Sequence, residues 1–281
     1  MSRTRFRQVF GVDFSGAKDA GARAWLARLD VRTKRPRLTS LQSLGAHAGS
    51  DARDAALGWL VSAIGASKDA LWGIDAPLGL PVELFDASDD WRAQLAYVRT
   101  FDRADAMGRA LVARSLERFG RHHVRRATDV ATKTPFDCYH YRIVHQTFAA
   151  MHDVLPALLA GRGTAVLPFD YAKLAKAERV VVEACPSSTL KRLGLPHQGY
   201  KQPTGAKLDA ARSKRRRALT TAIAEHVDVP QELARTMAQN RGGDALDAVV
   251  AALGAHEGFA REDHDDVRRD ARATREGRVY C

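Results

Sequence analysis

Acidic residues follow three apolar segments of the sequence, at points where a buried strand would end. Asp13 and Asp75 each come directly after a short apolar run, and Glu183 follows three consecutive valines. Burial of an isolated carboxylate costs several kcal/mol unless the group is paired or binds a metal. These positions are therefore candidates for chemistry rather than for ordinary surface charge.

A fourth acidic position, Asp244 with Asp247, opens the last helix that the sequence predicts. The two residues are three apart, so their side chains project from one face of that helix, one turn from each other. Carboxylates that converge on one point repel each other, and a divalent cation removes that repulsion. Mg²⁺ and Mn²⁺ prefer such hard oxygen ligands, and two ions about 4 Å apart can hold a phosphodiester and activate a water molecule.

Each acid also has a plain structural interpretation. Asp13 or Asp75 could bond backbone amides in the turn that follows its strand. Asp244 could cap the last helix, and Asp247 would favour the positive end of that helix. Glu183 could pair with a neighbouring arginine. A shared site is favoured because all four places fall on elements that can meet at one edge of a sheet.

The elements that would position these acids follow from the spacing of apolar residues. Three successive strands with short connections predict an antiparallel meander, and the apolar runs before Asp75 and around Glu183 predict two further strands. The predicted strands cover residues 7–15, 22–32, 37–44, 71–74 and 179–186, and the predicted helices cover residues 51–66, about 207–226 and a segment from Asp244 onward. The terminal GRVYC predicts a short edge strand.

The segment from 86 to 165 differs, because it contains little that predicts a strand. Residues 91–119 and 140–159 have helical patterns, so we expect a helical insertion at 86–165 within a core formed by residues 1–85 and 166–281. Without the insertion the order of elements is β-β-β-α-β-α-β-α. This order predicts an α/β fold with a mixed sheet and helices on its faces.

Four segments, in this order, resemble the motifs of the DUF429 family: GVDFSGA, WGIDAPLGLP, VEACPSSTLKRLGLPHQGYK and GGDALDAVVAALGA. That family is described as predicted nucleases with a ribonuclease H-like fold, and the order of elements given above matches that fold. The resemblance implies that Asp13, Asp75 and either Asp244 or Asp247 are metal ligands. The Asp-x-x-Asp spacing is similar to that of the Holliday-junction resolvases. Glu183 fits the family motif on what would be the fifth strand, and we include it among the candidate catalytic residues.

Residues near the acids are candidates for substrate binding. Gly16 would let the backbone approach a ligand, and Ser15 could touch a phosphate, although a plain turn would also suit both residues. Lys201 could neutralise phosphate charge or carry a proton, and Arg126 could bind substrate from the insertion. For Lys201 the alternative is a solvent-exposed place in a loop.

The composition is that of a globular protein, since 45% of the 281 residues are hydrophobic and 27% are charged. No apolar run approaches the roughly 18 residues of a membrane span, and the N-terminal segment has no signal-peptide pattern. Three distant cysteines without such a pattern predict reduced thiols. We therefore expect a cytoplasmic protein without a membrane partner.

The net charge of +11 favours a nucleic acid partner. Basic residues are spread along the chain, and only residues 214–217 form a block. Apolar residues surround that block at helical spacing. It could therefore be a solvated helix face or a phosphate-binding patch.

Together these features predict a metal-dependent nuclease that hydrolyses phosphodiester bonds with Mg²⁺ or Mn²⁺. Two alternatives stay open at this point. The first is an ATP-dependent phosphotransferase of the actin or sugar-kinase type, whose strand order starts alike. The second is a non-catalytic nucleic-acid-binding protein on the same fold. The sequence contains no Walker A loop, dinucleotide-binding loop, nucleophile elbow or zinc-ligand spacing.

Overall fold

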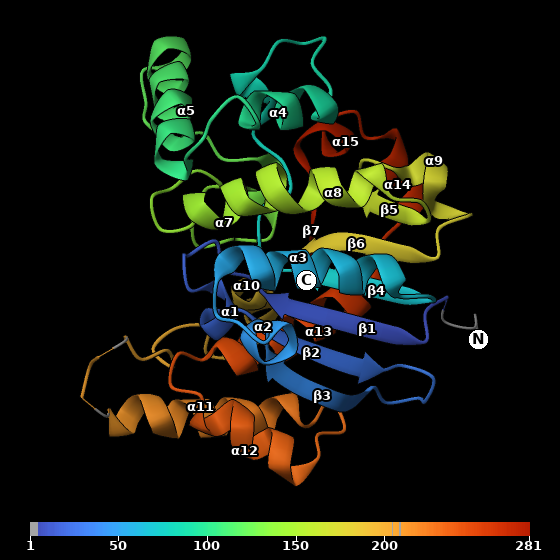
Figure 1. Cartoon of the computed structure of the whole chain (residues 1–281), viewed down its shortest axis with the longest axis vertical. Coiled ribbons are helices and arrows are strands. Elements are labelled where there is room, and N and C mark those ends of the chain that lie inside the picture. The colour runs from blue at the N-terminus through green and yellow to red at the C-terminus, as the bar shows by residue number, and fades with distance from the viewer. Residues whose placement is uncertain (1–4, 204, 208) are drawn as a thin grey trace.

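One mixed sheet forms the centre of the molecule (Figure 1). The computed structural model describes residues 5–203, 205–207 and 209–281, and in these ranges the strands take the order β3-β2-β1-β4-β6-β5, with β7 paired to β6. The strands are β1 (Gln8–Asp13), β2 (Trp25–Asp30), β3 (Arg37–Ser43), β4 (Ala70–Ile74), β5 (Thr164–Leu167), β6 (Arg179–Ala184) and β7 (Val279–Tyr280). The predicted α/β class and the predicted terminal edge strand are confirmed.

The sheet is antiparallel on one side of β1 and parallel on the other. β2 pairs antiparallel with β1 and with β3, whereas β4 pairs parallel with β1 and with β6. β5 and β7 are both parallel to β6, and β7 pairs with the end of β6 beyond the last residue of β5. The carboxyl ends of β1, β4 and β6 therefore lie at the same edge of the sheet.

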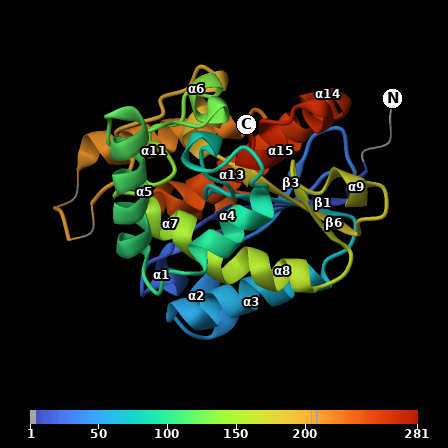
Figure 2. The same ribbon diagram turned by 90° about the horizontal axis from the view of Figure 1, so that it is seen from above.

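Helices cover both faces of this sheet, with α3 and α8 on one side and α13 on the other (Figure 2). The core helices are α1 (Ala20–Arg23), α2 (Leu44–Ala48), α3 (Arg53–Ala66), α9 (Tyr171–Leu174), α10 (Pro186–Arg192), α11 (Ala210–Ile223), α12 (Gln231–Gln239), α13 (Asp244–Arg261), α14 (His264–Arg269) and α15 (Ala273–Glu276). Residue 208, within the predicted basic helix that corresponds to α11, lies outside the described residues. None of the helices in the described ranges is long and apolar enough to cross a membrane.

Alternate residues of the central strands enter two separate cores, as the period of two in a strand requires. Phe10 and Val12 pack with Trp72 toward α3 and the insertion. Val9 packs with Leu71 toward α13 on the opposite face. Because both faces are covered, β4 and β6 are buried along their whole length.

Two glycines let α13 lie very close to the sheet. A Cβ atom at Gly11 of β1 would stand 2.1 Å from the carbonyl oxygen of Ala248, and one at Gly73 of β4 would stand 2.6 Å from Cβ of Ala255. Any larger residue at these positions would push the helix outward. This close approach also carries the first turn of α13 toward the end of β1.

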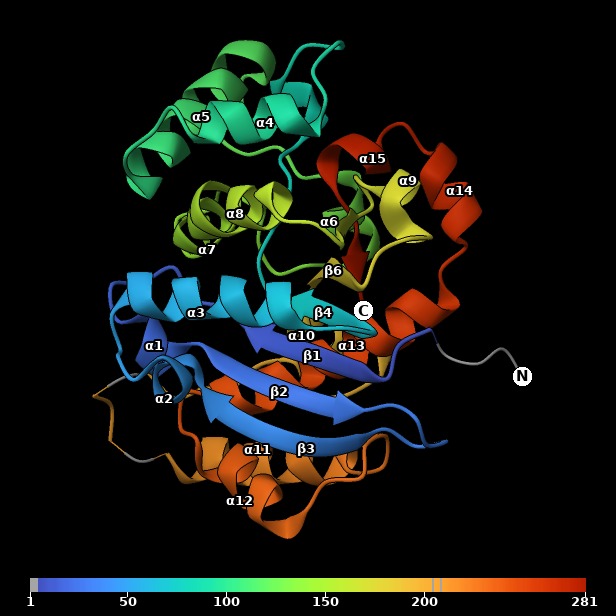
Figure 3. The same ribbon diagram turned by 45° about the vertical axis from the view of Figure 1, so that its right-hand side comes forward.

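The segment predicted as an insertion is mostly helical, with one difference at its end. It contains α4 (Trp91–Val98), α5 (Ala104–Phe119), α6 (Ala127–Ala131), α7 (Val144–Ala149), a π-helical turn (Ala150–Val154) and α8 (Leu155–Ala160), preceded by a 3₁₀ turn (Val82–Leu84). β5 starts at Thr164, inside the range 86–165 predicted to be helical. An apolar run as short as the one in this strand does not separate a strand from a buried helix by its periodicity. Figure 3 shows α4 and α5 at one end of the molecule and α11 and α12 at the other, beside β3.

Candidate functional site

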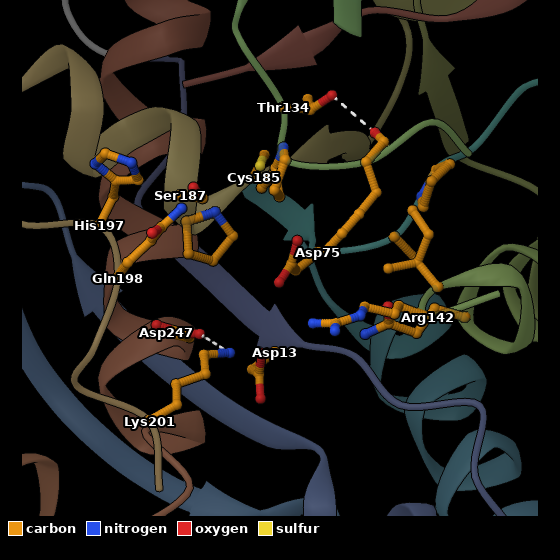
Figure 4. Close-up of a pocket in the computed structure, with 18 of the residues that line it drawn as sticks. Asp13, Asp75, Thr134, Arg142, Cys185, Ser187, His197, Gln198, Lys201 and Asp247 are labelled. Atoms are coloured by element: carbon orange, nitrogen blue, oxygen red, sulfur yellow. Dashed lines mark hydrogen bonds and ion pairs between the residues drawn. The ribbon is translucent and has the colours of Figure 1, made fainter. Parts of the chain in front are cut away.

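A cavity of about 540 Å³ opens at the edge of the sheet where β1, β4 and β6 end. Asp13, Asp75 and Asp247 line it together with Lys201. Figure 4 shows these four side chains facing one common space. The structure thus brings together three of the four aspartates that the sequence singled out as metal ligands.

The register of the strands places Asp13 beside Asp75. Gly11 pairs with Gly73 and Val12 with Ile74 in the parallel ladder, and the amide of Asp75 donates a hydrogen bond to the carbonyl oxygen of Val12 at 2.9 Å. Asp13 and Gly11 point to the same side of β1, because side chains two apart share a face. That side is the one that α13 covers.

Burial and mutual repulsion make these carboxylates hard to ionise. Burial raises the pKa of Asp13 well above its ordinary value, the neighbouring acids raise it further, and Lys201 lowers it. Burial likewise raises the pKa of Asp75 to about 7, with Asp247 adding to the effect and Lys201 opposing it. When all three aspartates are ionised they carry more negative charge than the one lysine balances, and a divalent cation relieves that repulsion.

Asp247 comes from the first turn of α13 and has two partners. The hydroxyl of Tyr200 donates to its Oδ1 at 2.7 Å, and Lys201 forms an ion pair with its Oδ2. The Asp247 side chain is almost fully buried, whereas that of Lys201 is half exposed. The positive end of the helix further favours a carboxylate at this position.

Asp244 lies next to the cluster rather than in the cavity wall. It is the first residue of α13 and is half-buried. Burial raises the pKa of Asp244, Asp247 adds to this, and Lys201 opposes it. In the described part of the chain it does not line the cavity. Of the two aspartates on the last helix, Asp247 is therefore the better placed to share a ligand with Asp13.

Glu183 has a different environment from the aspartates, although it also lies at the end of a strand. Its two oxygens accept from Nη2 and Nη1 of Arg126 at 2.5 and 2.8 Å, and Oε2 also accepts from the amide of Leu78 at 3.0 Å. Arg126 is fully buried and pairs in addition with Asp129, at 2.8 and 3.0 Å. Its Nη1 also approaches the carbonyl oxygens of Gly79 and Glu276.

This buried triad changes the interpretation of two predicted site residues. Arg126, Asp129 and Glu183 also line the cavity. A guanidinium with no exposed surface and only protein partners, however, joins the insertion to the sheet and does not suit substrate binding, which was the role predicted for Arg126. Glu183 fits the alternative of pairing with an arginine better than a catalytic role. Its side chain points away from α13, because it lies one residue out of phase with Val182, which packs in the α13 core.

Ser15 and Gly16 lie in the irregular segment between β1 and α1, and Gly16 packs against the insertion. A Cβ atom at Gly16 would stand 2.0 Å from the carbonyl oxygen of His145, so the glycine makes room for α7 and not for a phosphate. The hydroxyl of Ser15 accepts from the amide of Ala17 at 3.3 Å. Neither residue lines the cavity in the ranges that the structure covers. The plain-turn interpretation fits both positions better than substrate binding.

Two residues of the cavity were not predicted as site residues from the sequence. Tyr200 precedes Lys201 and holds Asp247 through its hydroxyl, and Arg142 enters the cavity from the insertion, opposite Lys201 (Figure 4). Arg142 is exposed, so it is free to contact a ligand in a way that Arg126 is not. Its position directly before Lys201 was the one sequence feature that could have indicated Tyr200.

The donor set fits Mg²⁺ or Mn²⁺. Carboxylate oxygens are the ligands that these ions prefer, and Mg²⁺ usually takes only one or two carboxylates, with water and substrate phosphate completing its shell. Asp13 and Asp75, neighbours in the sheet, meet that requirement. Within the residues described, no three His, Cys, Asp or Glu side chains already stand as joint ligands of one ion. Lys201 is the cation that currently balances Asp247.

Comparison with known proteins identifies a family whose function is not described. The model of the family described as "Protein of unknown function (DUF429)" matches residues 11–268. No curated protein and no solved structure matches the chain. The match covers all the acidic residues considered above.

Proposed function

The chain belongs to the DUF429 family, and from its site we propose that it is a metal-dependent nuclease that hydrolyses phosphodiester bonds in nucleic acid. One observation carries the proposal. Asp13, Asp75 and Asp247 converge at the ends of adjacent parallel strands and a helix, and the pKa values of Asp13 and Asp75 are raised. Such crowded acids in a cavity are typical of a functional site.

The strand order supports a ribonuclease H-like fold as part of this proposal. Along the chain an antiparallel meander of three strands precedes the parallel strands β4 and β6, as in the predicted order of elements. In the sheet these five strands lie in the order β3-β2-β1-β4-β6. β5 and β7 extend the sheet beyond that pattern. The late helix α13 lies across β1 and brings its own acid to the edge of the sheet.

In the proposed reaction the aspartates hold the metal and the basic residues hold the substrate. Asp13 and Asp75 would be ligands, with Asp247 completing the acidic wall and Tyr200 fixing its orientation. When bound, Mg²⁺ or Mn²⁺ stabilises charge on the phosphate and makes a bound water more acidic. Arg142 and Lys201 face the cavity from opposite sides and would orient the phosphate between them.

Hydrolysis of nucleic acid tests the proposal directly. Purified protein is incubated with Mg²⁺, Mn²⁺ or EDTA and a panel of single-stranded, duplex and branched DNA and RNA. We expect cleavage that requires the metal. No cleavage of any substrate with either metal would overturn the proposal. Phosphate transfer from ATP to a small acceptor would favour a phosphotransferase, and tight binding without turnover would favour a non-catalytic protein.

Lys201 should compete with the metal for the acidic cluster. Replacing Lys201 by Met removes the cation from Asp247, and a unit charge about 4 Å away is worth up to about 4 kcal/mol near a protein surface. Part of that energy is lost to solvent screening. We therefore expect Mn²⁺ to bind about tenfold more tightly, as measured by isothermal titration calorimetry.

A second lysine provides the control for this prediction. Lys173 is also half exposed and pairs at 3.0 Å with a buried carboxylate, that of Asp170, outside the cavity. Lys173→Met should leave Mn²⁺ affinity unchanged. If Lys201→Met binds Mn²⁺ as tightly as the wild type or more weakly, the lysine and the ion do not compete for the acidic cluster.

A further inference from the structure

A second cavity, of about 570 Å³, lies between α11 and α12 and has a strongly basic wall. We call it the α11–α12 groove, and its lining includes Ser213, Arg216, Arg217, Arg235, Gln239 and Arg241. No acidic residue lines it in the described part of the chain. We infer that this groove binds the phosphate backbone of a nucleic acid strand whose reacting phosphate enters the acidic cavity.

Three arginines without a counter-ion among the described residues gather in the groove. Arg217, Arg235 and Arg241 are exposed, and within the described residues none of them forms an ion pair with a carboxylate. Some exposed arginines elsewhere have such partners, as Arg109 has in Asp105 at 2.8 Å. Others, such as Arg99, Arg121 and Arg162, are exposed and do not line the groove. Like charges gathered without a counter-ion repel one another, and phosphate groups supply the missing charge.

Arg216 builds the groove rather than binding in it. It is fully buried, and its guanidinium donates to the carbonyl oxygens of Ala238 at 3.2 Å, Tyr200 at 2.7 Å and Arg241 at 3.3 Å. These bonds tie α11 and the end of α12 to the segment that carries Lys201. The basic block in the sequence is thus part structural and part exposed.

Neighbouring segments of the chain line the groove and the acidic cavity, with no lining residue in common among those that the structure describes. The amide of Gln202 donates to the carbonyl oxygen of Arg241 at 2.9 Å, while the neighbouring Lys201 pairs with Asp247 inside the acidic cavity. Arg212 of α11 also lines the acidic cavity. A strand bound in the groove therefore runs past Lys201 toward the aspartates. This continuity favours a chain of phosphates over a single small anion or an acidic peptide.

The inference rests on the proposed function only in assigning the reacting phosphate to the cavity, so binding can be tested apart from catalysis. The probes are fluorescein-labelled 20-nucleotide single strands and duplexes of DNA and RNA, titrated in EDTA and followed by anisotropy at several salt concentrations. The test variant is Arg217→Gln with Arg235→Gln and Arg241→Gln. The control variant is Arg99→Gln with Arg121→Gln and Arg162→Gln, which removes the same charge from exposed positions outside the groove.

We expect the groove variant to bind at least about tenfold more weakly and its salt slope to fall by about 2, since each lost contact with a single strand contributes about 0.7. The control variant should retain affinity and slope. Unchanged binding, equal losses in both variants, or competition by polyglutamate as strong as by unlabelled strand would each overturn the inference. Hydrolysis of bis(p-nitrophenyl) phosphate, which is too small to span both cavities, should survive in the groove variant. Its absence in the wild type would count against the nuclease proposal and leave the binding result standing.

Discussion

Replacing Asp13 by Asn should greatly slow metal-dependent hydrolysis while making the metal-free protein more stable. Loss of a ligand removes the charge stabilisation that the ion gives, which is worth several kcal/mol. A rate about a thousandfold lower follows, because each 1.36 kcal/mol is a factor of ten. The measurement is the rate of cleavage of the best substrate with saturating Mn²⁺.

The gain in stability follows from the sign of the pKa shift. Because the folded pKa of Asp13 lies above its unfolded value, the folded state holds its proton over a range in which the unfolded state has lost it. Stability from this group is present at low pH and is lost as pH rises through the folded pKa. Asn cannot ionise, so urea denaturation in EDTA at pH 8 should show Asp13→Asn to be more stable than the wild type.

Asp170 offers the control for this pair of effects. It is also a buried aspartate, but Lys173 balances it outside the acidic cavity. Asp170→Asn should retain cleavage and should not gain stability at pH 8. Cleavage that survives Asp13→Asn would remove the proposed site, even if the protein proved to be a nuclease.

The position of the acids in the fold could be predicted because it depends on local pattern. Apolar runs fix where β1, β4 and β6 end, and parallel pairing then brings their carboxyl ends together. The helical spacing of Asp244 and Asp247 places both in the first turn of α13. These steps use only short-range periodicity and the chemistry of buried carboxylates.

The grouping of the acids depends on which face of its strand each side chain points to. Asp13 and Asp75 follow glycines by two residues, and those glycines face α13. Glu183 follows Val182 by one residue and so faces the opposite core, where the insertion supplies Arg126. Counting residues along each strand would have separated Glu183 from the cluster.

Contacts between distant segments could not be predicted in this way. Gly16 lies against α7, which is more than a hundred residues away in the sequence. No residue near Gly16 in the sequence predicts that contact. Arg142 and Arg126 both come from the insertion and line the cavity, yet Arg142 is exposed and Arg126 is fully buried between two carboxylates. Their roles depend on how the insertion folds back on the sheet, which single-sequence periodicity does not contain.

Replacing Arg126 by Met should destabilise the protein by about 3–5 kcal/mol, the usual cost of leaving a buried ion pair without one partner. Arg126 bonds Glu183 and Asp129, and all three side chains are almost fully buried. Methionine fills similar space but leaves two carboxylates without their cation. The free energy of unfolding from urea titration at pH 8 measures this loss.

The loss of stability in Arg126→Met should depend on pH, and removal of the buried carboxylates should reverse much of it. Burial already raises the pKa of Glu183, and Arg126 opposes that rise, so without the arginine the carboxyl should stay protonated to higher pH. The destabilisation of Arg126→Met should therefore be smaller near pH 5 than at pH 8. Adding Glu183→Gln and Asp129→Asn removes the buried charges and should restore much of the lost stability.

Arg125→Met, at an exposed neighbour that donates to backbone oxygens, is the control and should cost about 1 kcal/mol. A loss below that level for Arg126→Met would mean that the triad does not hold the insertion on the sheet, and Arg126 would again be a candidate for substrate binding.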